Sequence, residues 1–240
     1  MVLAARGDVA PGTIADITEN EGRSLPETID AIRRWLGFSE PHFRLPVPTA
    51  AIWFLSHIAD GLGWLGWRSP LRSNAIHALK EGVRGNSRVW EAAGGNACRS
   101  LENSLAAMPS TLQERWFAKA YLIFPVTIAL LSFFWGYTGV IALIEMGATR
   151  HILVAHGLDG AIANTIVVSG AVADIALGAG LLWRPWTRYA CLGMILLSLA
   201  YLLGGTFVAP DLWADPAGPF VKVLPGIGLA LVALGLANER

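Results

Sequence analysis

Charged side chains are scarce in this chain of 240 residues. They make up 15% of the sequence, against about 25% in an ordinary soluble domain. Lysine and arginine together number 18, and aspartate and glutamate also number 18, so the net charge is zero. Proteins that bind nucleic acid need a basic excess to neutralise phosphates. The composition therefore argues against a nucleic-acid partner and leaves too little charge for a surface that faces water everywhere.

Cysteine is almost absent as well. Cys98 and Cys191 lie far apart in different kinds of segment, so they provide neither a disulfide framework nor a zinc spacing. His151 and His156 are five residues apart, whereas metal ligands on one helix face are typically three or four apart. We therefore expect no metal site. The opening sequence MVLAARGDVAPG has no apolar core of the kind found in a secretory signal.

The second half of the chain contains long apolar runs. A helix that spans a membrane needs about 20 mostly apolar residues. Four stretches fit this length: 121–144, 161–183, 189–208 and 220–237. The first helix either starts at Tyr121 or begins earlier, with an amphipathic turn around Arg115 and Lys119. Pro125 and Pro225 are expected near helix ends, where a missing N–H does least harm. The sequence predicts an all-α, multi-pass membrane protein with a cytosolic helical segment, residues 1–110, and a four-helix transmembrane domain, residues 111–240.

The basic residues of the short loops predict an orientation. Arg115 and Lys119 precede the first span. Arg184 and Arg188 lie in the loop between the second span and the third, and the chain ends in Asn-Glu-Arg. By the positive-inside rule these regions face the cytosol. Arg150 is an exception to this rule, because it lies in a loop that the other basic residues place outside. We expect both termini in the cytosol of a bacterial-type inner membrane, with residues 147–160 and 209–219 outside.

The connection between the third and fourth spans is rich in proline and acid. Its sequence, PDLWADPAGPFVKVLP, contains four prolines, which stiffen a tight turn. Lys222 lies just inside the fourth apolar run, and Glu145 ends the first span at the same expected depth. An ion pair between Glu145 and Lys222 would offset the desolvation of both groups, in a structural rather than a catalytic role.

One acid falls near the middle of a predicted span. Asp174 lies about 3 Å from the midpoint of residues 161–183 at about 1.5 Å per residue, where an ionised carboxylate facing lipid costs about 3 kcal/mol. Gly170 and Gly178 flank it by one turn, and small residues mark close helix approach. We expect Asp174 to point into the bundle, protonated. It is either a neutral acid bonded across the bundle or a protonatable group that serves a quinone or a proton path.

The segment 49–67 predicts an aromatic-rich helix, because its apolar residues recur with a helical period. These residues are Ala51, Phe54, Leu55, Ile58, Leu62 and Leu65. Ser56, His57 and Asp60 lie on the other side. Two placements stay open: the apolar face lies on the bilayer surface, or it packs against a protein partner.

The sequences VADIALGAGLLWRPW and LAYLLGGTFVAPDLWADPAGPFVKVLP resemble the DoxX-like family of four-helix membrane proteins. The shared features are Asp174 before Gly178, the Arg-Pro-Trp turn and an outer-loop motif. The motif residues are Pro210, Trp213, Asp215, Pro216, Gly218, Pro219, Lys222 and Pro225. The resemblance covers residues 112–238 and implies a four-helix membrane fold. It also implies a link to redox chemistry, because related proteins form a membrane subunit of a thiosulfate:quinone oxidoreductase.

Four stretches of the first part resemble the C-terminal end of atypical short-chain dehydrogenases. They are SLPETIDAIRRWLGF, RLPVPTAAIWFLSHIADGLGWLGWRSPL, ALKEGVRGNSRVWEAAGG and RSLENSLAAMPSTLQERWF. In that family this portion packs beside an NAD(P)-binding Rossmann domain and is sometimes fused to a DoxX-like tail. The family's glycine-rich turn has no counterpart here, and its Tyr-x-x-x-Lys pair is missing because the first tyrosine is Tyr121. The resemblance implies a separate Rossmann polypeptide as a partner and no cofactor site in this chain.

Two classes of function follow from these features. In the first, the chain is a membrane module that anchors or assembles with a dehydrogenase-like redox partner and has no catalysis of its own. In the second, the bundle itself acts on a quinone or another lipid-linked redox compound, with Asp174 as the candidate residue. A small-solute transporter is a third reading, based on the same acid alone. The sequence identifies no catalytic residue, substrate or oligomeric state.

Overall fold

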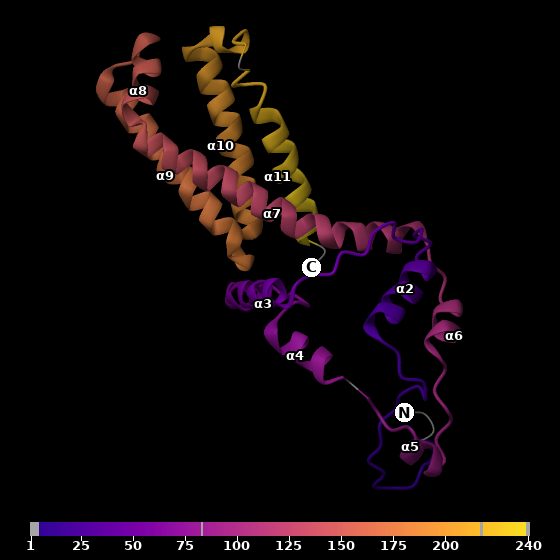
Figure 1. The fold of residues 1–240 in the computed structure, drawn as a ribbon. Coiled ribbons are helices and arrows are strands. Elements are labelled where there is room, and N and C mark those ends of the chain that lie inside the picture. The colour runs from indigo at the N-terminus through magenta and orange to yellow at the C-terminus, as the bar shows by residue number, and fades with distance from the viewer. Residues whose placement is uncertain (1–4, 83, 217, 239–240) are drawn as a thin grey trace. The chain divides into compact units, whose positions relative to one another are not determined.

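The computed structural model is helical in the part of the chain that it describes, residues 5–82, 84–216 and 218–238, and those residues contain no strand (Figure 1). The chain divides into two compact units. Met1–Ala59 and Pro70–Lys119 form the amino-terminal unit, and Asp60–Ser69 and Ala120–Arg240 form the membrane unit. The predicted all-α class is confirmed. The assignment of Asp60–Ser69 to the membrane unit is not evident from the sequence.

The amino-terminal unit contains α2 (Leu25–Trp35), most of α3 (Thr49–Trp64), α4 (Ser73–Glu81), α5 (Arg88–Ala92), α6 (Leu101–Ala106) and the start of the next helix, α7 (Leu112–Ile144). Ser24 starts α2 with a capping box, in which its hydroxyl accepts from the Glu27 amide and the Glu27 carboxylate accepts from the Ser24 amide. Arg23 pairs with Glu102 of α6. These contacts fix the start of α2 beside α6.

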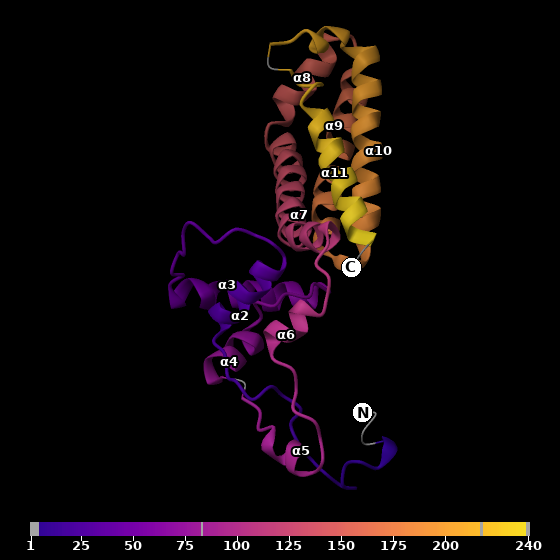
Figure 2. The ribbon, with the colours of Figure 1, turned by 90° about the vertical axis from the view of Figure 1, so that its right-hand side faces the viewer.

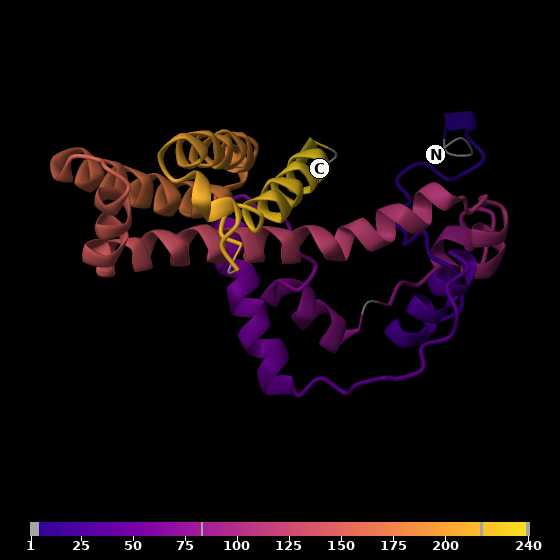
Figure 3. The same cartoon turned by 90° about the horizontal axis from the view of Figure 1, so that it is seen from above.

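The membrane unit contains most of α7 (Leu112–Ile144), with α8 (Met146–Ala155), α9 (Gly160–Leu182), α10 (Thr187–Val208) and α11 (Val223–Asn238). Two short 3-10 turns connect them, η1 (Arg184–Trp186) and η2 (Pro210–Trp213). The four long helices run alongside one another (Figure 2), and from above α7 passes along one side of α10 and α11 (Figure 3). Phe124 and Trp135 of α7 share the core with Met194 of α10 and Ala233 of α11.

Three helices, α7, α9 and α10, are long and apolar enough to cross a membrane. The predicted multi-pass fold is therefore confirmed. The fourth apolar helix is shorter than predicted. With 16 residues, α11 extends about 24 Å at about 1.5 Å per residue, less than the roughly 30 Å of a hydrocarbon core.

The structure shows the earlier of the two starts considered for the first apolar helix, and a later start than predicted for the fourth. α7 begins at Leu112, so Pro125 lies inside the helix and not near its end. α11 begins at Val223, because residues 218–222 turn back on themselves. Lys222 therefore precedes the last apolar helix. Residues 239 and 240, which belong to the Asn-Glu-Arg end used to predict orientation, lie outside the described residues.

Candidate functional site

Asp174 and Tyr201 form a hydrogen-bonded pair between two spanning helices. The Tyr201 hydroxyl, on α10, donates to Asp174 Oδ1 on α9 at 3.0 Å. Asp174 is half-buried and Tyr201 is 38% exposed. The pair therefore joins α9 to α10 at a place that is open on one side of the bundle.

A glycine makes room for the phenol. A Cβ atom at Gly170 would stand 2.8 Å from the Tyr201 hydroxyl oxygen, closer than real side chains approach. The hydroxyl therefore reaches Asp174 across a surface that Gly170 leaves bare. At Gly170 the neighbour is thus the Tyr201 side chain, whereas Gly178 is the flanking glycine that meets the backbone of another helix.

α7 approaches α9 at the same level. A Cβ atom at Gly139 would lie 2.6 Å from the Ala171 carbonyl oxygen and 3.0 Å from Asp174 Cβ. One turn further along α9, a Cβ atom at Gly178 would lie 3.0 Å from the Ser132 carbonyl oxygen. The Ser132 hydroxyl also donates to the Gly178 carbonyl oxygen at 2.8 Å. Glycines on both helices thus hold the backbone around Asp174 in close contact with α7.

Tyr201 and Gly139 are site residues that the sequence analysis missed. A signal for Tyr201 was present, because a phenol inside an apolar span needs a hydrogen-bond partner and Asp174 is in the neighbouring span. Gly139 gives no comparable signal. Its role depends on which helix lies opposite, and that is visible only in the folded bundle.

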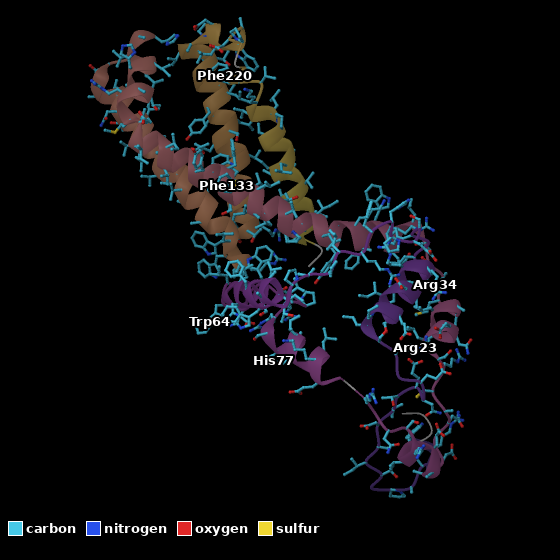
Figure 4. All side chains as sticks on the ribbon, viewed as in Figure 1. Arg23, Arg34, Trp64, His77, Phe133 and Phe220 are labelled. Atoms are coloured by element: carbon cyan, nitrogen blue, oxygen red, sulfur yellow. The ribbon has the colours of Figure 1, made fainter. Side chains whose placement is uncertain are left out.

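The first half of the outer-loop motif forms a small aromatic cluster. Pro210 begins η2, and the Trp213 indole N–H donates to Thr206 Oγ1 at 2.9 Å. The Trp213 ring meets Phe220 (labelled in Figure 4) nearly edge-on, with 5.3 Å between ring centroids. A Cβ atom at Gly205 would lie 2.5 Å from the Phe220 ring. The hairpin therefore folds back onto the end of α10, where it has a structural role.

The second half of the motif makes the turn into α11. Gly218 has a φ of 58°, in the left-handed region that glycine adopts at least cost. Its amide donates to the Asp215 carbonyl oxygen at 2.8 Å, and its own carbonyl oxygen accepts from the Lys222 amide at 3.0 Å. Pro216 and Pro219 flank Gly218, and Pro225 lies in the first turn of α11. This half of the motif also serves the turn.

The predicted ion pair between Glu145 and Lys222 is not formed. Both residues are exposed. Glu145 is the N-cap of α8, which packs on α9, whereas Lys222 belongs to the turn before α11. Glu145 and Lys222 therefore belong to two different connections of the bundle, the start of α8 and the turn into α11.

His156 makes an ion pair at this end of the bundle. Its Nε2 lies 3.1 Å from Asp211 Oδ1 in η2, and its Nδ1 lies 2.7 Å from the Ile152 carbonyl oxygen. Both ring nitrogens face acceptors, and only the imidazolium form donates from both. The Ile152 carbonyl, and then the Asp211 carboxylate, raise the pKa of His156 above its ordinary value. Within residues 5–82, 84–216 and 218–238, no three histidine, cysteine, aspartate or glutamate side chains could hold a metal ion.

Comparison with known proteins supports the membrane class. The sequence model of the DoxX-like family matches residues 132–231. This stretch includes Asp174, Tyr201 and the whole outer-loop motif, and it runs from α7 into α11. No curated protein and no solved structure matches the chain. The membrane unit is therefore similar to the DoxX-like family, and the dehydrogenase-like resemblance of the first part stays a prediction.

Proposed function

We propose that this chain is a membrane subunit of a redox system, whose bundle binds a quinone or a related lipid-soluble carbonyl compound beside Asp174 and Tyr201. The observation that carries the proposal is the hydrogen bond of 3.0 Å between these two side chains. Ionisable groups in membrane spans are costly, and they commonly mark ligand or proton paths. The similarity to the DoxX-like family over residues 132–231 supports the membrane setting.

The chemistry of the pair suits such a ligand. Reduction of a quinone to a quinol takes up two electrons and two protons. Tyr201 would donate a hydrogen bond to one quinone oxygen, and protonated Asp174 would deliver one proton to it as a general acid. The redox partner would supply the electrons, and water at the membrane surface would supply the second proton and reprotonate Asp174. The half-buried position of Asp174 gives a ligand dissolved in the bilayer a way in.

Tyr201→Phe tests this binding role, because it removes the hydroxyl and keeps the ring. We expect the variant to bind decylubiquinone about 2–10-fold more weakly, since a neutral hydrogen bond contributes about 0.5–1.5 kcal/mol. The measurement is a calorimetric titration of the protein in lipid nanodiscs.

The matched control is Tyr137→Phe on α7. Tyr137 is an exposed phenol in another spanning helix, and its ring stacks on Phe133 (labelled in Figure 4) with 5.5 Å between centroids. This variant should keep the affinity of the unmodified protein. Equal affinities in all three proteins, or no binding by the unmodified protein, would contradict the proposal.

We infer a second function, assembly with a separate NAD(P)-binding Rossmann polypeptide, from the surface of the amino-terminal unit. Its loops expose Ile14, Phe43 and Leu45, which are 93%, 85% and 86% accessible. Apolar side chains this exposed in the single chain suit burial in a protein interface, and the dehydrogenase-like sequence resemblance suggests the class of partner. Co-expression with a Rossmann polypeptide encoded beside this chain should give a complex, and Leu45→Glu should weaken it. Separate purification of the two chains would contradict this function.

A further inference from the structure

α3 carries its large apolar side chains on the outside. Trp53, Phe54 and Trp64 are 63%, 61% and 90% exposed, whereas Ser56 and Ala59 are buried. Trp64 projects from the end of the helix (Figure 4). Between residues 50 and 63 the sequence contains one acidic or basic residue other than histidine, Asp60. Such a helix is too apolar on its outer side to be covered by water alone.

The exposed apolar side chains form one continuous face. At about 100° per residue, Phe54 and Ile58 lie on the side away from Ser56 and Ala59, and Trp53 and Trp64 lie beside them, toward Asp60. His57 is also on this face, but it is held against the helix. Its Nδ1 lies 2.9 Å from the Trp53 carbonyl oxygen, and the two rings are 4.1 Å apart. The face therefore presents rings and aliphatic groups over most of its length.

The end of α3 is fixed inside the membrane unit. The Leu65 carbonyl oxygen accepts from the Arg184 amide at 2.9 Å, and the Trp67 indole N–H donates to the Leu182 carbonyl oxygen at 2.6 Å. The Arg184 guanidinium lies over the Trp67 ring at 5.4 Å. These bonds place the chain just after α3 at the end of the spanning helix α9.

This end of α9 has the features of a membrane–water boundary. Trp183 and Trp186 stack with 5.5 Å between centroids and are 47% and 55% exposed. Arg184 and Arg188 lie in the same turn region. Tryptophan belts and basic residues are typical of the headgroup level. Trp64 precedes Leu65, which is bonded to Arg184, so its exposed ring lies near the headgroup level.

We propose that α3 is an interfacial helix, which lies in the boundary between headgroups and acyl chains with Trp53, Phe54, Ile58 and Trp64 turned toward lipid. Its 16 residues extend about 24 Å at about 1.5 Å per residue, too short to cross a core of about 30 Å. An aromatic face on a short helix suits the bilayer surface. A bilayer fits better than a protein partner, because the face begins where the spanning bundle ends, and because Asp60 is the one acidic or basic residue other than histidine between residues 50 and 63.

A spin label at Phe54 tests the proposal. Phe54→Cys and Glu81→Cys, at the exposed end of α4, are each made with Cys98→Ser; Cys191 is fully buried. Each labelled protein is placed in vesicles of phosphatidylcholine and phosphatidylglycerol. Collision rates are measured with oxygen, which concentrates in lipid, and with a water-soluble nickel chelate. We expect oxygen to dominate at position 54 and nickel to dominate at position 81.

Two results would overturn the proposal. Dominant nickel collisions at position 54 would mean that the face lies in water. Low collision rates with both reagents would mean that a protein, such as a second copy of this chain, covers it. Ile58→Cys reports on the same face and gives a second reading if Phe54→Cys does not fold.

Discussion

Gly139 lets α7 pack against α9 beside Asp174, and this contact leaves no room for a methyl group. A Cβ atom there would lie 2.6 Å from the Ala171 carbonyl oxygen, which is backbone and cannot rotate away. We expect Gly139→Ala to lower the free energy of unfolding by about 1–3 kcal/mol, as overpacking does. Thermal unfolding in a mild detergent measures the change.

Gly136→Ala is the control for this prediction. A Cβ atom at Gly136 has no atom within 4 Å outside its own local backbone, and alanine favours a helix by up to about 1 kcal/mol over glycine. This variant should unfold at the same temperature as the unmodified protein or higher. If Gly139→Ala were equally harmless, α7 and α9 could not be as close as the structure has them.

Asp174 shows how far sequence reasoning reaches at the residue scale. Its depth in an apolar run and its flanking glycines are visible in the sequence, and these features alone single it out. Its partner depends on which residue of the next span arrives opposite. The tilt and register of the two helices determine which residue that is. The hydrogen bond from Tyr201 to Asp174 therefore depends on packing that no sequence pattern specifies.

His156 joins two elements, α8 and η2, by a contact that depends on its charge. Its pKa is raised by the Ile152 carbonyl and by Asp211. The contact is therefore fully present below the ordinary histidine pKa of about 6.5 and is lost as pH rises through the raised value. We expect His156→Gln to lower the unfolding temperature at acidic pH and to have a diminishing effect as the solution becomes alkaline.

The control for the pH series is His151→Gln, since His151 is an exposed histidine on the same helix. It should change the unfolding temperature little. An effect of His156→Gln that stayed constant from acid to alkaline pH would show that the charged contact with Asp211 does not contribute.

Helix existence was easier to predict than helix ends. The apolar runs predict α7, α9 and α10 because roughly 20 apolar residues in series have few other uses. α7 extends back to Leu112 through the amphipathic turn around Arg115 and Lys119, which the sequence indicates without fixing the first residue of the helix. α11 begins late because Gly218 turns the chain sharply. The docking of Trp67 on Leu182 is a long-range contact, which a local pattern does not show.

The whole chain is expected to enter and leave the membrane on the same side. The basic turn between α9 and α10, at Arg184 and Arg188, favours the cytosol for that end of the bundle. A reporter fused after the last residue should then report the cytosol, and one inserted at residue 214 should report the opposite side. Reporter activity on one side only would mean that the short helix α11 does not complete a fourth crossing.

We propose that Asp174 is protonated within the bilayer and takes part in ligand binding there. Infrared difference spectroscopy of the carboxyl carbonyl stretch measures both properties, with the protein in lipid and decylubiquinone as the ligand. We predict a protonated-carboxyl band that is missing in Asp174→Asn, which keeps a hydrogen-bond donor but has no exchangeable acid proton. The band should shift when the ligand binds, because Tyr201 then divides its hydrogen bonding between Asp174 and the quinone. A band that stays unmoved while the ligand is bound would mean that Asp174 takes no part in binding, and a band absent from the unmodified protein would mean that Asp174 is ionised.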